Sequence, residues 1–169
     1  MFGKILAAAA LAAVAVCSVS ADAVPVKINE SVILAEHNRY RTKVGVPPLA
    51  WSNNLAKGAQ RWAETLAALD RMQHSGTSGV GENLAYWSGP NASPLRTMIG
   101  LWEREKDYFR PGTFPGVSST GNWLSVAHYT QMVWRRTKKV GCGIGNNGRT
   151  DFLVCWYSPR GNYVGQVPY

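Results

Sequence analysis

The stretch HYTQMVW at residues 128–134 decides how the rest of the chain is interpreted. It combines a titratable imidazole, two hydroxyls, an amide and an indole, a mixture that neither a core strand nor a plain loop requires. Of these groups, imidazole is the type that ordinarily serves as an acid, a base or a metal ligand. We therefore expect the stretch to position something polar, with His128 as the candidate for chemistry and its neighbours holding it in place and packing the core.

The chain begins with the pattern of a secretory signal peptide. Lys4 provides a positive start, residues 5–16 form an apolar run rich in alanine, and small residues stand at positions 19–21. We expect cleavage after Ala21 or, alternatively, after Ala23, and hence a secreted, extracellular protein, periplasmic or cell-wall associated in a bacterium. The apolar run is too short for a membrane span, so stable membrane insertion is not expected and an N-terminal anchor is the less favoured alternative.

The remaining chain is long enough for one well-cored domain and short for two. Removing the leader also removes Cys17, which leaves Cys142 and Cys155 as an even pair in an oxidising compartment. We expect them to form a disulfide, since neither belongs to a C-x-x-C metal motif. The predicted organisation is a signal peptide over residues 1–21, a lead-in over residues 22–29 and a single domain over residues 30–169.

The formal net charge is +8, from 18 Lys and Arg against 10 Asp and Glu. A basic secreted protein favours contact with a cell wall, an acidic polysaccharide or an anionic lipid surface. Nucleic acid is not an expected partner, because the basic residues are scattered and no nucleic-acid module is visible. The single basic cluster, at residues 135–139, is interpreted as a solvated turn.

Hydrophobic periodicity predicts helices and a hairpin. Apolar positions at helical spacing predict one helix over residues 30–44, capped by Asn29 or Ser31, and a second over residues 52–69. A third helix is predicted with Ser93 as its cap and Pro94 as its first residue, and with an apolar stripe as far as Phe109. Loops are predicted over residues 72–91 and 108–124, hairpin strands over residues 140–144 and 151–157, and an edge strand over residues 163–167.

Helical geometry separates two acids of the third helix. At about 100° per residue, Glu105 lies close to the apolar stripe and Glu103 well away from it. We therefore expect Glu105 to face inward and Glu103 to be an ordinary surface charge.

Four polar residues form a candidate site: His74, Glu82, Glu105 and His128. Two imidazoles and two carboxylates suit metal binding or acid–base work, because imidazole titrates near neutrality and a carboxylate can orient it. Taken singly, each is equally well explained as a satisfied buried polar group. His37 is expected to be a hydrogen-bonded structural residue. A serine hydrolase is poorly supported, because the sequence has no G-x-S-x-G nucleophile elbow.

Four segments carry a family resemblance: HNRYR at residues 37–41, GENL at 81–84, the run at 126–134 and CWYSPRGN at 155–162. In this order they resemble the CAP superfamily of cysteine-rich secretory, antigen five and pathogenesis-related class one proteins. The resemblance implies an α/β (α+β) fold, namely a three-layer α-β-α sandwich with a central, mainly antiparallel sheet.

The resemblance also implies a central cavity lined by two histidines and two glutamates, which correspond to His74, Glu82, Glu105 and His128. In several relatives the histidines bind zinc or a similar divalent ion, so His74 and His128 are the candidate metal ligands. Ala127 departs from the family pattern, which has glycine before the histidine. A methyl group there is expected to crowd the cavity wall or to demand an altered turn.

The leading hypothesis is a secreted, non-catalytic module that binds a sterol, a fatty acid or another small apolar ligand, together with a divalent metal in its cavity. The region assigned to sterol contact in fungal relatives here contains Tyr108, Phe109, Phe114 and Trp123. A competing hypothesis is a metal-dependent extracellular hydrolase in which Glu82 or Glu105 acts as base. A third is a defence or virulence effector that acts through protein recognition.

Overall fold

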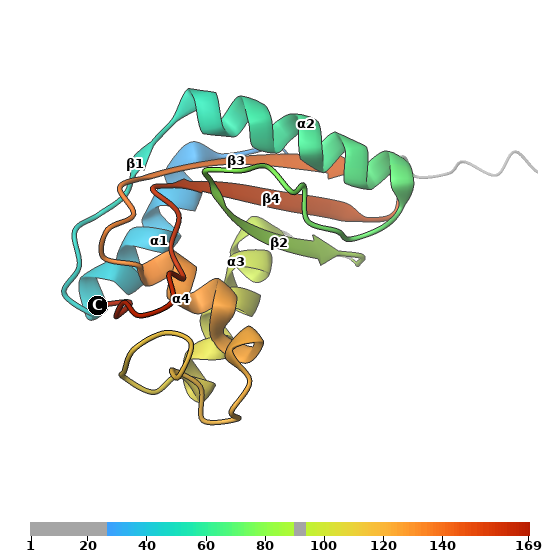
Figure 1. Cartoon of the computed structure of the whole chain (residues 1–169). Coiled ribbons are helices and arrows are strands. Elements are labelled where there is room, and N and C mark those ends of the chain that lie inside the picture. Colours follow the sequence, from blue (N-terminus) through green and yellow to red (C-terminus); the bar gives the residue numbers. More distant parts are fainter. Residues whose placement is uncertain (1–26, 90–93) are drawn as a thin grey trace, which may run out of the picture.

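The computed structural model describes residues 27–89 and 94–169 of the chain (Figure 1). Its helices are α1 Glu30–Lys43, α2 Asn53–Leu69, α3 Pro94–Arg104 and α4 Ala127–Val133, with 3-10 turns η1 Glu105–Tyr108 and η2 Trp123–Val126. Its strands are β1 Ala50–Trp51, β2 Gly81–Trp87, β3 Lys139–Asn146 and β4 Asp151–Ser158. The predicted signal peptide and the predicted Ser93 cap lie outside the described residues.

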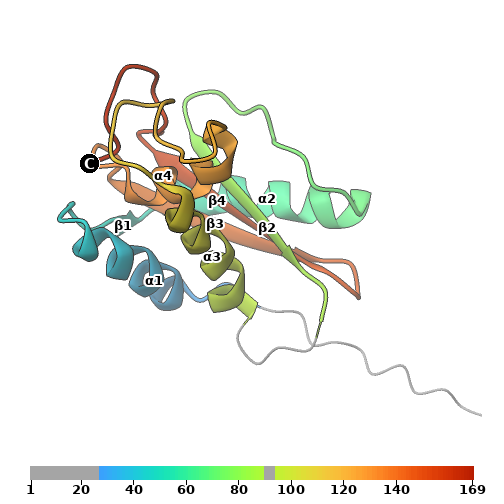
Figure 2. The same ribbon diagram turned by 90° about the horizontal axis from the view of Figure 1, so that it is seen from below.

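The chain forms three layers. Helix α2 covers one face of the sheet, and α1, α3 and α4 cover the other (Figure 1 and Figure 2). The strand order is β1-β3-β4-β2, in which β1 and β3 run parallel and the other pairs antiparallel. The predicted sandwich with a mainly antiparallel sheet is thus confirmed. Within residues 27–89 and 94–169, no helix is both long and apolar enough to cross a membrane.

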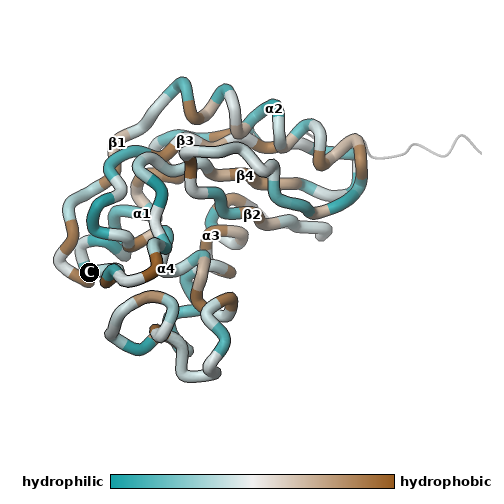
Figure 3. Tube along the Cα trace, in the orientation of Figure 1, coloured by the Kyte–Doolittle hydropathy of each residue, from teal (hydrophilic) through white to brown (hydrophobic). Residues whose placement is uncertain are grey.

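Polar caps fix where the first two helices begin. The Asn29 side chain accepts a hydrogen bond from the Val32 amide over 3.2 Å, and Ser52 accepts one from the Leu55 amide over 3.4 Å. Hydrophobic and hydrophilic positions alternate along α2, as expected of a helix with one face on a sheet (Figure 3). Helix α3 ends at Arg104, earlier than predicted, because the chain tightens there into η1.

Helix α2 lies directly on the backbone of β3. A Cβ added at Gly141, Gly143 or Gly145 would stand 2.3, 2.2 or 2.2 Å from backbone atoms of α2. Because side chains alternate along a strand, these glycines leave one face of β3 bare for the helix. The opposite face carries Cys142 and Ile144 into the core, where Cys142 forms the predicted disulfide with Cys155, its partner in β4.

Beyond the short strand β1, the outer edge of β3 is hydrogen-bonded by a side chain of α2. Strand β1 pairs with β3 only at Lys139 and Val140. Further along, Gln60 of α2 donates from Nε2 to the Ile144 carbonyl over 2.8 Å and accepts from the Ile144 amide over 3.0 Å. The Gln60 amide therefore satisfies both backbone groups that Ile144 presents on that side.

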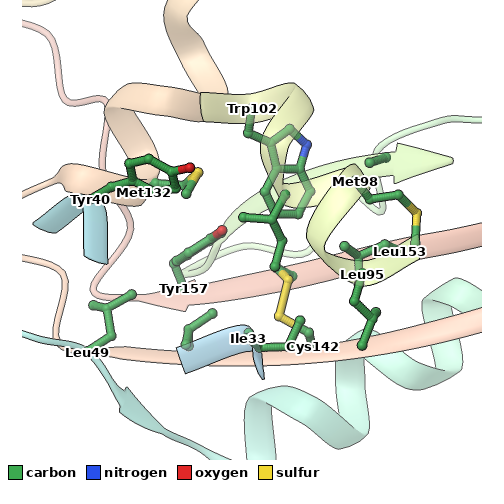
Figure 4. Close-up of a cluster of buried hydrophobic side chains, with 14 of the residues drawn as sticks. Ile33, Tyr40, Leu49, Leu95, Met98, Trp102, Met132, Cys142, Leu153 and Tyr157 are labelled. Carbon is green, nitrogen blue, oxygen red and sulfur yellow. A yellow bond between two sulfur atoms is a disulfide. The ribbon is translucent and has the colours of Figure 1, made fainter. Parts of the chain in front are cut away.

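The main core lies between the sheet and the layer of three helices (Figure 4). Trp102 of α3 is 2% exposed, and its indole donates to the Leu84 carbonyl of β2 over 2.9 Å. Around it pack fully or almost fully buried residues from α1, α3, α4, β3 and β4, among them Ile33, Met98, Met132, Val140, Leu153 and Tyr157.

Arg41 is a fully buried cation that ties α1 to the turn after α4. Its guanidinium donates to the carbonyls of Met132, Trp134 and Thr137 over 2.9–3.0 Å and to that of Pro47 over 2.6 Å. Burial lowers the pKa of Arg41 to about 10, so the group stays protonated at neutral pH. Four backbone carbonyls, rather than a carboxylate, thus solvate this charge.

Two predicted elements were wrong. The predicted loop over residues 72–91 contains β2, which pairs along its whole length with β4. The sequence GENLAYW did not predict a strand, because Glu82 and Asn83 are polar. Their side chains occupy buried positions, where a strand is ordinarily apolar. The predicted edge strand at residues 163–167 is a turn, although Gly165 and Gln166 exchange two backbone hydrogen bonds with Phe114.

Candidate functional site

His128 is positioned by Glu105 at the start of α4. The ring nitrogen Nδ1 of His128 lies 2.6 Å from Glu105 Oε1, while Glu105 Oε2 accepts from the backbone amides of His128 and Tyr129 over 2.9 and 3.0 Å. One carboxylate therefore orients the imidazole and caps the helix that carries it. Glu105 faces inward as expected, whereas Glu103 is also largely buried and pairs with Lys106.

His74 is positioned in the same way from the loop before β2. Its Nδ1 lies 2.6 Å from Glu82 Oε1, which also accepts from the Ser75 amide over 3.0 Å. The other oxygen, Glu82 Oε2, accepts from the Trp156 indole over 2.8 Å. Both oxygens of Glu82 are thereby held, and His74 is fixed relative to the sheet although its side chain is 67% exposed.

The hydrogen-bond pattern leaves one nitrogen of each histidine free. An ionised carboxylate can only accept, so Nδ1 of His74 and of His128 must carry the hydrogen. In the described chain neither Nε2 atom has a hydrogen-bond partner. When neutral, each imidazole therefore offers an Nε2 lone pair to a ligand, the arrangement that metal-binding histidines use.

Charge pairing shifts the titration of the His74–Glu82 pair. The hydrogen bond to Glu82 raises the pKa of His74 above its ordinary value, against the opposing effect of burial. Burial acts to raise the pKa of Glu82, but the hydrogen bonds from His74, Ser75 and Trp156 outweigh it and lower the pKa. The two directions agree, and they favour an ionised pair.

His74 and His128 face a common cavity. Its volume is about 480 Å³, and its wall also includes Glu82, Trp123 and Arg160. Gln131 forms part of the floor, since its Oε1 accepts from the Gly161 amide over 2.7 Å and a Cβ at Gly81 would stand only 2.0 Å from that oxygen. The structure thus brings both predicted histidines to one space.

Ala127 adopts an ordinary helical conformation. With φ −64° and ψ −39° it is the first residue of α4, a geometry that any residue accepts. It lines the cavity, and its carbonyl accepts from the Asn162 amide group over 2.9 Å. The expected altered turn is therefore absent at this position.

His128 also faces an apolar groove on its other side. This groove, of about 560 Å³, runs between β2 and α3 and is lined by residues that include Leu84, Tyr86, Leu101 and Trp102. The rings of His128 and Trp102 stack with centroids 6.2 Å apart and planes 18° apart. His128 and its neighbour Glu105 therefore stand where a polar end and an apolar body of one ligand could meet.

His37 has a structural role, as predicted. It is fully buried, with Nδ1 2.8 Å from the Ile33 carbonyl and Nε2 2.8 Å from the Tyr157 hydroxyl. Burial lowers the pKa of His37 to about 4. It belongs to the core and does not join the other two histidines.

The four aromatic residues predicted to contact a ligand separate into two groups. Phe114 is 4% exposed and packs between Trp123 and Trp134, and Phe109 packs against Tyr129 and Tyr169. Tyr108 and Trp123 are 52% and 40% exposed, and of these Trp123 lines the cavity. Phe114 is therefore a core residue in this structure, and its contact with a ligand stays a prediction.

Nε2 of His74 and Nε2 of His128 are the predicted donors for a cation at this cavity. In the described residues no three side chains of the His, Cys, Asp and Glu types gather closely enough to hold an ion. The protein would supply Nε2 of His74 and of His128, and solvent or a ligand would complete the coordination.

Comparison with known proteins identifies the family to which this chain is similar. The chain matches the cysteine-rich secretory protein family, CAP, over residues 34–157. It is 36% identical over 168 residues to venom allergen 5 of Polistes fuscatus, covering 86% of this chain and 80% of that protein. It is 40% identical over 138 residues to pathogenesis-related leaf protein 6 of Solanum lycopersicum, covering 80% of each.

Solved structures agree with the fold. The crystal structure of NaASP2 with Zn2+ superposes with a TM-score of 0.70 at 24% identity, covering 85% of this chain and 87% of that one. The sequence matches and the α-β-α sandwich agree, and the chain belongs to the CAP family.

Proposed function

We propose that this protein is a secreted, non-catalytic module that binds a small amphipathic lipid, such as a fatty acid or a sterol. The carrying observation is that His128 lines both the polar cavity and the apolar groove. The polar end of the ligand would meet His128, and its apolar body would lie along Leu84, Leu101 and Trp102. The groove volume of about 560 Å³ falls in the range of small-molecule sites.

The state of the carboxylates supports binding over catalysis. A general base needs a free lone pair directed at its substrate. Both oxygens of Glu105 and both of Glu82 already accept hydrogen bonds from the histidines, backbone amides or Trp156. Their arrangement favours holding the imidazoles in place. Each carboxylate uses three of its about four lone-pair positions in this way, so the metal-dependent hydrolase would have to rely on the remaining lone pair of Glu82 Oε2 or Glu105 Oε1.

Secretion is supported by the predicted signal peptide and by the relatives, which are venom and pathogenesis-related proteins. The disulfide between Cys142 and Cys155 fits an oxidising compartment. The effector hypothesis remains an alternative prediction.

The lipid proposal is tested by titrating purified protein with a fluorescent fatty-acid analogue and with cholesterol. Leu101, which is 40% exposed in the groove, is changed to Asp, and Leu69, 48% exposed on α2, is changed to Asp as the matched control. We expect Leu101→Asp to weaken binding roughly tenfold, because the loss of apolar burial and the added charge both oppose the ligand. Absence of saturable binding to both probes would refute the proposal.

A divalent metal is a second candidate ligand, favoured by the two free Nε2 atoms at one cavity. Native mass spectrometry of protein purified without chelator separates metal from lipid by mass. We expect retained metal in the wild type and its loss in the double variant His74→Ala, His128→Ala. Equal metal content in both proteins would rule out this pair as ligands.

A further inference from the structure

Large hydrophobic side chains are exposed on two segments, one of which lines the cavity. Trp123 and Leu124 of η2 are 40% and 59% exposed, and Tyr163, Val164 and Val167 in the C-terminal segment are 36%, 77% and 57% exposed. We call these five residues the rim patch. An exposed valine next to other exposed apolar residues has no role in the core and marks a surface that meets something apolar.

Phe114 holds the two parts of the rim patch together. Its ring centroid lies 5.3 Å from that of Trp123, and its backbone exchanges hydrogen bonds of 2.8 and 2.9 Å with Gln166 and Gly165. Both ribbon views show the C-terminal segment and the segment before α4 side by side (Figure 1 and Figure 2). Trp123 and Leu124 also line the cavity, so the patch surrounds part of its mouth.

Positive charge gathers beside the rim patch. From residue 108 to the C-terminus the sequence has seven Lys and Arg but a single acid, Asp151, which is buried. Much of the net charge of +8 therefore lies in this part of the chain. The only exposed acid in the neighbouring η1 is Asp107.

Backbone contacts place this charge next to the rim patch. The Arg135 amide donates to the carbonyl of Pro168, the residue after Val167, over 2.7 Å. The Arg160 guanidinium lies 4.6 Å from the centre of the Tyr163 ring. In the described chain, no ion pair involves the exposed basic residues of this region, Arg135, Arg136, Lys138, Lys139 and Arg160.

We infer that the rim patch and these basic residues dock the protein on an anionic lipid bilayer, with the cavity mouth turned toward the membrane. Tryptophan prefers the lipid–water interface, valine and leucine gain by entering the acyl boundary, and cations beside them meet anionic headgroups. An acidic polysaccharide would engage the cations but would gain nothing from Val164 and Val167. The inference concerns docking and does not require the lipid-binding proposal.

Vesicle sedimentation tests the inference. Full-length mature protein is mixed with phosphatidylcholine vesicles, with and without phosphatidylserine, at low and high salt. We expect binding only to the vesicles that contain phosphatidylserine, and weaker binding at high salt. Arg135→Gln with Arg136→Gln should weaken partitioning roughly fivefold for each charge removed. Val164→Ser with Val167→Ser should weaken it roughly tenfold.

Matched controls lie on α2, on the opposite side of the sheet. Lys57→Gln with Arg61→Gln removes two exposed charges, and Leu69→Ser removes an exposed apolar side chain. Both controls should bind vesicles like the wild type. All the changed positions are on the surface, so we expect every variant to fold. Circular dichroism checks this.

Two results would overturn the inference: equal binding to neutral and anionic vesicles, or valine variants that bind like the wild type. In the second case, binding of dextran sulfate by the same proteins would identify a polysaccharide surface instead. The fatty-acid titration is run in parallel without vesicles. The arginine variants should leave that titration unchanged. The vesicle assay therefore measures docking, the titration measures lipid binding, and the failure of one can be distinguished from the failure of the other.

Discussion

Tyr157 donates its phenolic hydrogen to Nε2 of His37 across 2.8 Å, and both side chains are completely buried. The direction is fixed because His37 Nδ1 donates to the Ile33 carbonyl, which leaves Nε2 as the acceptor. Asn83 of β2 donates to the same hydroxyl over 3.2 Å. This chain of hydrogen bonds links α1, β4 and β2 and needs a neutral imidazole.

The first prediction concerns acid stability. The pKa of His37 is about 4 in the folded protein and about 6.5 in the unfolded chain. The unfolded state therefore binds a proton first, so the contribution of His37 is complete above pH 6.5 and is lost as the pH falls toward 4. Over that interval we expect the wild type to lose about 3 kcal/mol more unfolding free energy than His37→Gln. Urea unfolding across this pH range checks the difference, and parallel curves would contradict it.

The second prediction concerns the exposed histidine. Because Glu82 raises the pKa of His74, the stability from this pair is fully present below the unfolded histidine pKa and is lost as the pH rises through the folded one. Glu82→Gln should lower the pKa of His74, as followed by NMR titration of the imidazole. An unchanged pKa would show that the carboxylate does not control this ring.

The third prediction concerns Glu105. Glu105→Ala removes the cap from two amides of α4 and the orienting partner of His128, and it should lower the unfolding free energy by about 1–2 kcal/mol. Glu103→Ala is the matched control, since it breaks only an ion pair with the exposed Lys106 and should cost less than about 1 kcal/mol. Thermal unfolding of both variants measures the two effects, and equal losses would count against the capping role.

The fourth prediction concerns the contact of α2 with β3. Gly143→Ala places a methyl carbon 2.2 Å from Gln60 Cα, so the helix must move, and we expect a loss of about 2–3 kcal/mol or more. Gly100 in α3 has no atom within 4 Å of an added Cβ, and Gly100→Ala should instead stabilise the helix by about 0.5–1 kcal/mol. Chemical denaturation measures the unfolding free energy of both variants. An unchanged unfolding free energy in Gly143→Ala would contradict the close contact between α2 and β3.

Local sequence signals predicted much of this fold. The caps Asn29 and Ser52 mark helix starts through side chains that bind nearby amides, and Asn146–Gly148 marks the hairpin by turn chemistry. The disulfide followed from the count of cysteines. Each of these signals acts over a few residues, which is why sequence alone suffices.

Features that depend on the partner element were missed. The sequence did not reveal strand β2, because Glu82 and Asn83 are polar. Their side chains bind His74, in the preceding loop, and Tyr157, which is distant in sequence. The apolar groove beside His128 could not be foreseen, because its lining comes from both β2 and α3. Alternate glycines at 141, 143 and 145 were an available signal for a close helix, but that reading requires knowing which element faces them.

The pairing of Gln60 with Ile144 has a consequence for association between molecules. A sheet edge that presents free amides and carbonyls invites a strand from another chain. Here the short β1 leaves the side of β3 exposed to that hazard, and the Gln60 side chain occupies the donor and acceptor that an incoming strand would use. A single glutamine in a helix thus blocks pairing at this point of the β3 edge, an effect that usually comes from charge, proline or a bulge on the edge strand itself.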